Sequence, residues 1–216
     1  MNLVFPRLYA IIEPALLTIS ELALAEALAE SGVELIQYRN KTAQSRQFFE
    51  NSLQLSKSLV PRGVRFIVND RPDIALLTGA GGVHVGQEDL GVEEARGICG
   101  QDRWVGVSTH TLEQVAAADR TSADYIAFGP IFPTATKQNP DAVVGTELLR
   151  RARKMTAKPL VAIGGITLER AAEVYRAGAD SLAVIRDLIC AAKPGERARE
   201  FLAVAVSVTP AQEGSG

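Results

Sequence analysis

Eight short apolar runs recur along the chain, and a segment with helical periodicity follows each of them. Most of the runs lack alternation of polar and apolar residues, which is typical of parallel strands covered on both faces. Eight strands that alternate with helices in 216 residues predict an α/β fold, a single-domain (β/α)8 TIM barrel. An open doubly wound sheet is the alternative that the same pattern allows. The runs are residues 8–12, 33–38, 65–68, 82–85, 104–107, 125–128, 160–163 and 181–185.

The segments between the runs carry recognisable helix ends. The segment SELALAEALAESG opens on Ser20, a residue type that caps helix starts, and closes on Gly32, a residue type that ends helices. Three later segments open on Thr111, Thr146 and Thr167. These signals predict a helix between consecutive strands, as a barrel requires.

Composition limits the class of protein. A chain that is 47% hydrophobic can bury one sizeable core, so we expect one domain over residues 1–208 and a flexible tail over residues 209–216. The net charge of −2 argues against a partner such as nucleic acid or a membrane surface. No apolar run approaches the roughly 20 residues that cross a bilayer. Cys99 and Cys190 are isolated and require no disulfide, so we expect a cytoplasmic protein.

The second apolar run ends in an unusual cluster of cations. Side chains alternate along an extended chain, so Gln37, Arg39 and Lys41 point one way, whereas Tyr38 and Asn40 point the other. Two cations at the end of a buried strand repel each other unless an anion lies between them. The pattern therefore indicates an anionic ligand.

Two aspartates follow the next two strands. Asp70 comes after FIVN, and Asp89 lies in GQED. Carboxylates at adjacent strand ends can share Mg²⁺, which prefers oxygen ligands and accepts substrate phosphates. Each aspartate taken alone fits a turn or a helix cap better than a metal site, and Asp70 could cap the helix that begins in RPDIALL. A diphosphate with its metal would explain the cations and the carboxylates together.

Two later strand ends carry further signals for an anion. The segment Gly129–Lys137 is long and contains two threonines and a lysine, although an ordinary surface loop has the same composition. The AIGGI segment, residues 162–166, puts a Gly-Gly turn before a helix, where backbone amides bind phosphate. The loops after strands seven and eight of barrels are a frequent phosphate site.

The histidines and serines indicate neither zinc nor hydrolase chemistry. His84 lies within an apolar run and is expected to be a hydrogen-bonded structural residue, whereas His110 is expected to cap a helix or to contact ligand. No cysteine cluster accompanies them, so a zinc site is disfavoured. Ser108 lacks the glycine elbow of a hydrolase nucleophile.

Taken together, these segments resemble the thiamine-phosphate synthase family. The matching pieces occur in family order across residues 8–185: QYRNK, VNDRPDIAL, GVHVGQED, GVSTH, DYIAFGPIFPTATK, PLVAIGGI and GADSLAVI. The resemblance implies a Mg²⁺-dependent transferase that joins a pyrimidine diphosphate to a thiazole phosphate and releases pyrophosphate. It also implies a dissociative reaction, in which the electron-rich aminopyrimidine stabilises a methylene cation that the thiazole nitrogen captures. Small molecules are thus the expected partners, and association into a homo-oligomer stays open.

The resemblance also assigns site residues by their positions in the matching motifs. Asp70 and Asp89 are expected to hold Mg²⁺, and Arg39, Ser108 and Lys137 to be catalytic. The residues expected to bind the pyrimidine diphosphate are Gln37, Arg39, Lys41, Asn69, Ser108 and Lys137. Tyr38 and Asn40, in the same motif, are also expected to contact substrate. Those expected around the thiazole phosphate are Thr134, Thr136, Gly165, Ile185 and Arg186.

Two positions depart from the family pattern, and two other functions stay open. Glu13-Pro14 stands where the family commonly has an aspartate, and Arg186 where it has a serine; Arg186 can contact phosphate or pair with Asp187. A related thiazole tautomerase has a histidine at the position of Pro130. A binding protein that has kept the pocket without catalysis is the second alternative.

Overall fold

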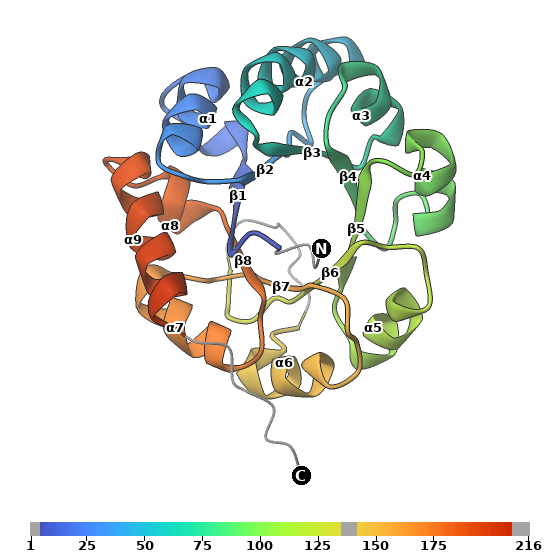
Figure 1. Ribbon diagram of the computed structural model, residues 1–216, viewed down its shortest axis with the longest axis vertical. Helices are drawn as coiled ribbons and strands as arrows, with labels where there is room; N and C mark the ends of the chain where they lie inside the picture. Colours follow the sequence, from blue (N-terminus) through green and yellow to red (C-terminus); the bar gives the residue numbers. More distant parts are fainter. Residues whose placement is uncertain (1–4, 135–141, 209–216) are drawn as a thin grey trace.

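Eight parallel strands close into a barrel in chain order, as the computed structural model shows for residues 5–134 and 142–208 (Figure 1). Each strand pairs with its neighbour in sequence, and β1 pairs with β8, with Tyr9 opposite Ala183. This closure confirms the barrel and excludes the open sheet. The strands are β1 (Leu8–Ile12), β2 (Leu35–Tyr38), β3 (Arg65–Asn69), β4 (Gly82–Val85), β5 (Trp104–Thr109), β6 (Tyr125–Phe128), β7 (Leu160–Ile163) and β8 (Ser181–Val184).

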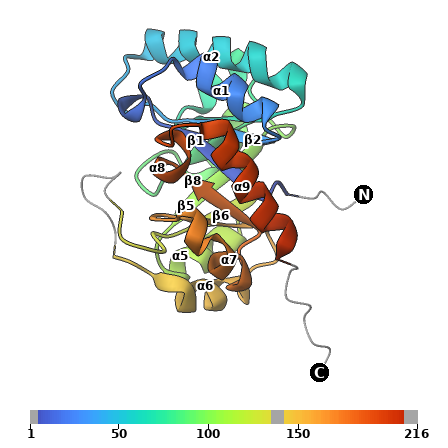
Figure 2. The same ribbon diagram turned by 90° about the vertical axis from the view of Figure 1, so that its left-hand side faces the viewer.

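Helices surround the barrel, with α1 and α2 on one side and α6 and α7 on the opposite side (Figure 2). The helix α9 packs between α1 and α7. No helix in the described ranges is long and apolar enough to cross a membrane. The helices are α1 (Glu21–Glu30), α2 (Ser45–Leu59), α3 (Pro72–Thr78), α4 (Val92–Cys99), α5 (Leu112–Asp119), α6 (Gly145–Arg153), α7 (Leu168–Arg176), α8 (Arg186–Ile189) and α9 (Pro194–Ser207), with 3-10 turns η1 (Pro14–Leu16) and η2 (Val60–Arg62).

The predicted helix starts are confirmed in part. The Ser20 hydroxyl accepts the Ala23 amide at 3.2 Å. Thr111 caps α5 in the same way. Thr167 occupies the capping position of α7 without a side-chain bond, and Thr146 lies inside the first turn of α6, which begins one residue earlier.

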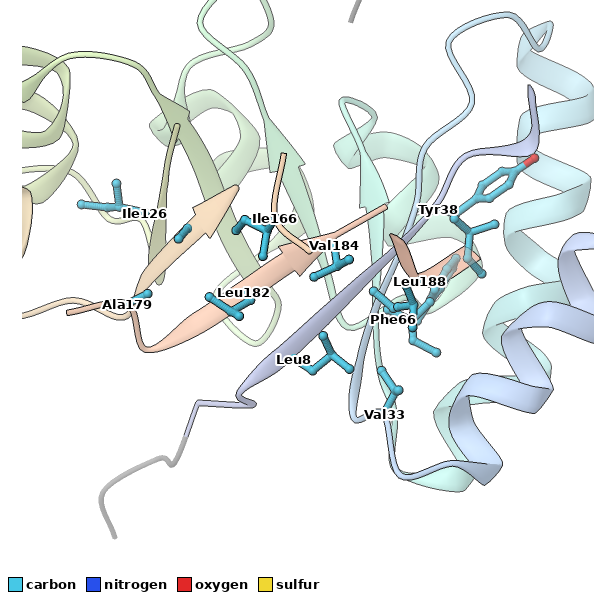
Figure 3. Packing of buried hydrophobic residues seen from close by; sticks show 14 of the residues in the cluster. Leu8, Val33, Tyr38, Phe66, Ile126, Ile166, Ala179, Leu182, Val184 and Leu188 are labelled. Atoms are coloured by element: carbon cyan, nitrogen blue, oxygen red, sulfur yellow. The ribbon is translucent and has the colours of Figure 1, made fainter. Parts of the chain in front are cut away.

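Alternate side chains of the strands form two separate apolar layers. Outward residues such as Leu8, Phe66 and Leu182 pack against the helices and form the larger core (Figure 3). Inward residues such as Tyr9 and Ile67 fill the barrel interior. The strand period of two therefore gives each strand one face toward the helices and one toward the interior.

Aromatic residues fill the amino-terminal end of the barrel interior. Phe5 precedes β1, and its ring stacks on Trp104 with the ring centroids 5.1 Å apart. The guanidinium of Arg65 lies over the ring of Trp104, 4.0 Å from its centroid. This packing fills the interior at the amino-terminal ends of the strands.

Candidate active site

A cavity of about 730 Å³ opens at the carboxyl ends of the strands. Inward-facing strand residues and the loops that follow β2 to β8 form its walls, at the end where barrels carry their ligands. The structure places most of the sequence-predicted site residues on these walls. They are Gln37, Arg39, Lys41, Asn69, Asp70, Asp89, Ser108, Thr134, Gly165, Ile185 and Arg186.

Tyr38 and Asn40 do not line this cavity, so the structure does not support their predicted contact with ligand. Tyr38 is fully buried in the outer layer (Figure 3), where its ring stacks on Phe48 with the ring centroids 5.2 Å apart. Its hydroxyl accepts the side-chain amides of Asn51 at 3.0 Å and Asn40 at 3.2 Å. The strand period turns Tyr38 away from the interior, and the side chain of Asn40, just beyond β2, lies against the Tyr38 hydroxyl. They fasten the end of β2 to α2.

Two predicted residues of the sixth loop, Thr136 and Lys137, lie outside the described residues. The predicted tail, residues 209–216, lies outside them as well. Their expected roles stay predictions from the sequence.

Each cation at the end of β2 already has a carboxylate partner. Arg39 pairs with Glu13, which follows β1 and is only 7% exposed, and Lys41 pairs with Asp70. Glu13 therefore supplies a carboxylate from the position where the family commonly has the shorter aspartate. The two carboxylates therefore offset the positive charges that the strand end brings together.

Asp70 has the most unusual backbone of the site. Its φ of 61° is the one positive φ at a non-glycine residue in the described ranges. Aspartate tolerates this left-handed conformation better than most residues, and such positions cluster at functional sites. The Asp70 carboxylate pairs with Lys41, and the capping position of α3 is Arg71, so Asp70 does not cap this helix.

The carboxylates of Asp70 and Asp89 lie next to each other in the cavity. Burial raises the pKa of Asp70 above its ordinary value; Lys41 opposes this effect, whereas the neighbouring Asp89 adds to it. Asp89 is fixed by the backbone amide of Gly86, 2.8 Å from its Oδ2. Two ionised carboxylates at close range repel each other unless they share a proton or a cation.

This pair fits a Mg²⁺ ion that completes its shell with other oxygens. In the described ranges no group of three or more His, Cys, Asp and Glu residues could hold a metal, so protein ligands alone would not enclose one. Mg²⁺ is commonly held by one or two carboxylates, with waters and substrate phosphates as its other ligands. Asp70 and Asp89 supply that number of carboxylates.

The opposite wall is built around the Gly164-Gly165 turn after β7. Both glycines have positive φ, and a Cβ at Gly165 would lie 2.5 Å from the carbonyl oxygen of Pro133. The turn can therefore pack closely against the loop after β6 because side chains are absent. Arg186 lines the same region, while the carboxylate of Asp187 accepts the amide of Leu168 at 2.9 Å.

Several wall residues were not predicted as ligand contacts. His84, expected to be structural, is hydrogen-bonded as foreseen, but it also lines the cavity beside Ser108. Tyr9 and Arg170 line it too. For His84 the missing signal is strand register, because His84 lies opposite Asn69 in the pairing of β3 with β4.

The fold and the cavity define a (β/α)8-barrel protein whose charged pocket opens at the carboxyl ends of its strands. The family described as thiamine monophosphate synthase matches residues 8–188. The chain belongs to this family.

Named relatives agree over almost the whole chain. The thiamine-phosphate synthase of Koribacter versatilis is 48% identical over 94% of this chain and 97% of its own length. That of Chloroflexus aurantiacus is 44% identical over 88% of this chain and 87% of its own. Among solved structures, thiamine phosphate pyrophosphorylase from Pyrococcus furiosus superposes with a TM-score of 0.85 at 33% identity, covering 94% of this chain and 96% of that one.

Proposed function

We propose that the chain is a thiamine-phosphate synthase. It condenses 4-amino-2-methyl-5-hydroxymethylpyrimidine diphosphate with 4-methyl-5-(2-phosphoethyl)thiazole, or its carboxylated form, and releases pyrophosphate. The observation that carries the proposal is the meeting of Arg39 and Lys41 with the carboxylates of Asp70 and Asp89 in one cavity. Family membership supports it.

The pyrimidine diphosphate would bind at the ends of β2 to β5. Arg39 can form paired hydrogen bonds with one phosphate, and Lys41 can act as a point charge on the other. Mg²⁺ held by Asp70 and Asp89 would neutralise charge that builds up on the departing pyrophosphate. The Ser108 hydroxyl lies at the same end of the cavity and can donate a hydrogen bond to the ligand. Lys137 is proposed from the sequence alone as a third cation.

The thiazole phosphate would bind at the opposite wall. Backbone amides around Gly165 and Ile185 are suited to its phosphate, because the glycine turn lets the backbone approach closely. Arg186 supports this assignment through its place on the cavity wall, and Thr134 contributes a hydroxyl. Two substrates held on facing walls leave the protein one main task, which is to keep the reacting atoms together.

The thiazole tautomerase reading requires a histidine at position 130. Pro130 stands there and lines the cavity, so the tautomerase is not favoured. The binding-protein reading differs from the synthase in turnover, and the following experiment separates them.

The test mixes the purified protein with both substrates, with and without Mg²⁺, and follows thiamine phosphate and pyrophosphate together. Equimolar, metal-dependent formation of both products is expected. Arg39→Gln should abolish most of this turnover, whereas Arg153→Gln should retain it. Arg153 is a matched control, because it is similarly part-buried and paired with a carboxylate, Asp180, outside the cavity. A folded protein that binds thiazole phosphate and forms no product would contradict the proposal.

A further inference from the structure

A chain of hydrogen bonds crosses the barrel interior at the floor of the cavity. Gln37 Nε2 donates to the Tyr9 hydroxyl at 2.7 Å, and this hydroxyl lies 2.9 Å from that of Tyr125. The Tyr125 hydroxyl lies 3.1 Å from Nδ1 of His84, whose Nε2 lies 2.8 Å from the Ser108 hydroxyl. We call this set of five side chains the interior chain. Its two ends belong to the proposed site, and its three middle members do not.

Packing holds the middle members in fixed places. Tyr9 and Tyr125 are at most 1% exposed. Their rings meet edge to face with the centroids 5.9 Å apart, and the His84 ring stacks on Tyr125 at 5.5 Å. Tyr9 and His84 also line the cavity, but the hydrogen-bond partners of their polar atoms are members of the same set. The interior chain is their source of hydrogen bonds.

The number of protons in the interior chain couples its two ends. Each tyrosine hydroxyl has one proton, and a neutral imidazole has one N–H. If Gln37 donates to Tyr9, then Tyr9 donates to Tyr125 and Tyr125 donates to Nδ1 of His84. The N–H of His84 is then on Nε2, and it donates to Ser108. The opposite order requires every member to reverse together, and a break within the chain leaves a buried polar atom unpaired.

We propose that Tyr9, Tyr125 and His84 are positioning residues that preset Gln37 and Ser108 for the pyrimidine substrate. In the order given above, the Gln37 amide leaves its carbonyl oxygen as an acceptor, and Ser108 keeps its hydroxyl proton to donate. One end of the interior chain accepts and the other donates before any ligand arrives. This inference rests on the proposed function, since the pyrimidine diphosphate is the ligand that those two residues are assigned to.

The kinetic test breaks the interior chain at two points while keeping the rings. Tyr125→Phe and Tyr9→Phe each remove one hydroxyl. Each should raise the KM for the pyrimidine diphosphate, or lower its kcat/KM, by about tenfold and leave the KM for the thiazole phosphate unchanged. Because either change interrupts the same chain, the double variant should be no worse than the more damaged single variant.

Tyr175→Phe is the matched control. Tyr175 is a buried tyrosine on α7 whose hydroxyl donates to the carbonyl oxygen of Arg7 at 2.7 Å, away from the cavity. It should lose a similar amount of stability and retain wild-type kinetics. Additive effects of the Tyr9 and Tyr125 variants, equal changes in both KM values, or wild-type kinetics in both variants would overturn the proposal.

A second measurement does not depend on turnover. The nitrogen chemical shifts of His84 report which ring nitrogen carries the proton. The wild-type protein should show one tautomer, and Tyr125→Phe should show a mixture or the other tautomer, whereas Tyr175→Phe should leave the shifts unchanged. A tautomer mixture in the wild type, or no change in Tyr125→Phe, would overturn the interior chain. Failure of wild-type turnover with a single His84 tautomer would instead contradict the proposed function.

Discussion

Lowering the pH from 7 to 5 is expected to destabilise the protein by about 2 kcal/mol through His84 alone. His84 is 7% exposed, and burial lowers its pKa from 6.5 to about 4, with the charge of Asp89 opposing this shift. Both ring nitrogens are engaged, one with Tyr125 and the other with Ser108. The folded protein therefore favours the neutral ring over the pH range in which an exposed imidazole becomes charged.

The sign and the size follow from proton uptake. Because the pKa of His84 is lower in the folded protein, the unfolded chain takes up a proton first as the pH falls. The stabilisation is complete above pH 6.5 and is lost between pH 6.5 and about 4. At pH 5 the solution is 1.5 pH units below the unfolded pKa, and each unit is worth about 1.4 kcal/mol. The loss at pH 5 is therefore about 2 kcal/mol, and it would reach about 3 kcal/mol near pH 4.

Urea unfolding at pH 7 and pH 5 measures this loss in the wild type and in His84→Gln. Carboxylates titrate in both proteins, so the difference between the two losses isolates His84. Equal losses in the wild type and His84→Gln, or a His84 proton resonance that titrates near pH 6.5, would refute the reasoning.

Three further changes test the strand ends. Asp70→Asn should keep the fold, because asparagine also tolerates a positive φ, and should lower turnover at limiting Mg²⁺ by about tenfold or more; near-wild-type turnover there would remove the metal assignment. Arg39→Gln should lower the free energy of unfolding in urea by about 2 kcal/mol, because Glu13 is left buried without its partner. Adding Glu13→Gln to that variant should restore stability but not turnover. A double variant as unstable as Arg39→Gln alone would count against the pair. Tyr38→Phe should lose about 1 kcal/mol of stability with unchanged kinetics, and a higher KM for the pyrimidine diphosphate would return Tyr38 to the site.

The barrel was predictable because its signals are local. Short apolar runs, helix caps and glycine stops repeat along the sequence, and four of the eight strands have the predicted bounds, among them β1 and β4. The cavity walls were predictable for a related reason, since the ends of parallel strands meet at one rim. Strand alternation also separates Tyr38 and Asn40 from Gln37, whereas the continuous QYRNK motif groups all of them together. The structure agrees with the alternation signal, because Tyr38 and Asn40 do not line the cavity, whereas Gln37 does.

Contacts between distant segments could not be predicted from local patterns. The pairing of Arg39 with Glu13 depends on how the loop after β1 turns, and that of Lys41 with Asp70 depends on a positive φ at the aspartate. The interior chain depends on the register of several strands at once. Sequence patterns predict which face of a strand a residue occupies. They do not predict the register between strands, which is set when the barrel closes.

Every anion in solution competes for Arg39 and Lys41, and their carboxylate partners decide which anions succeed. An ordinary phosphate ion must displace Glu13 or Asp70 and leaves a carboxylate behind without its cation. The diphosphate proposed above, bound with a divalent metal, would bring a replacement cation for Asp70 together with an anion for Lys41. Under the proposed function, these pairs would disfavour inorganic phosphate and favour a metal-bound diphosphate, which brings both an anion and a cation.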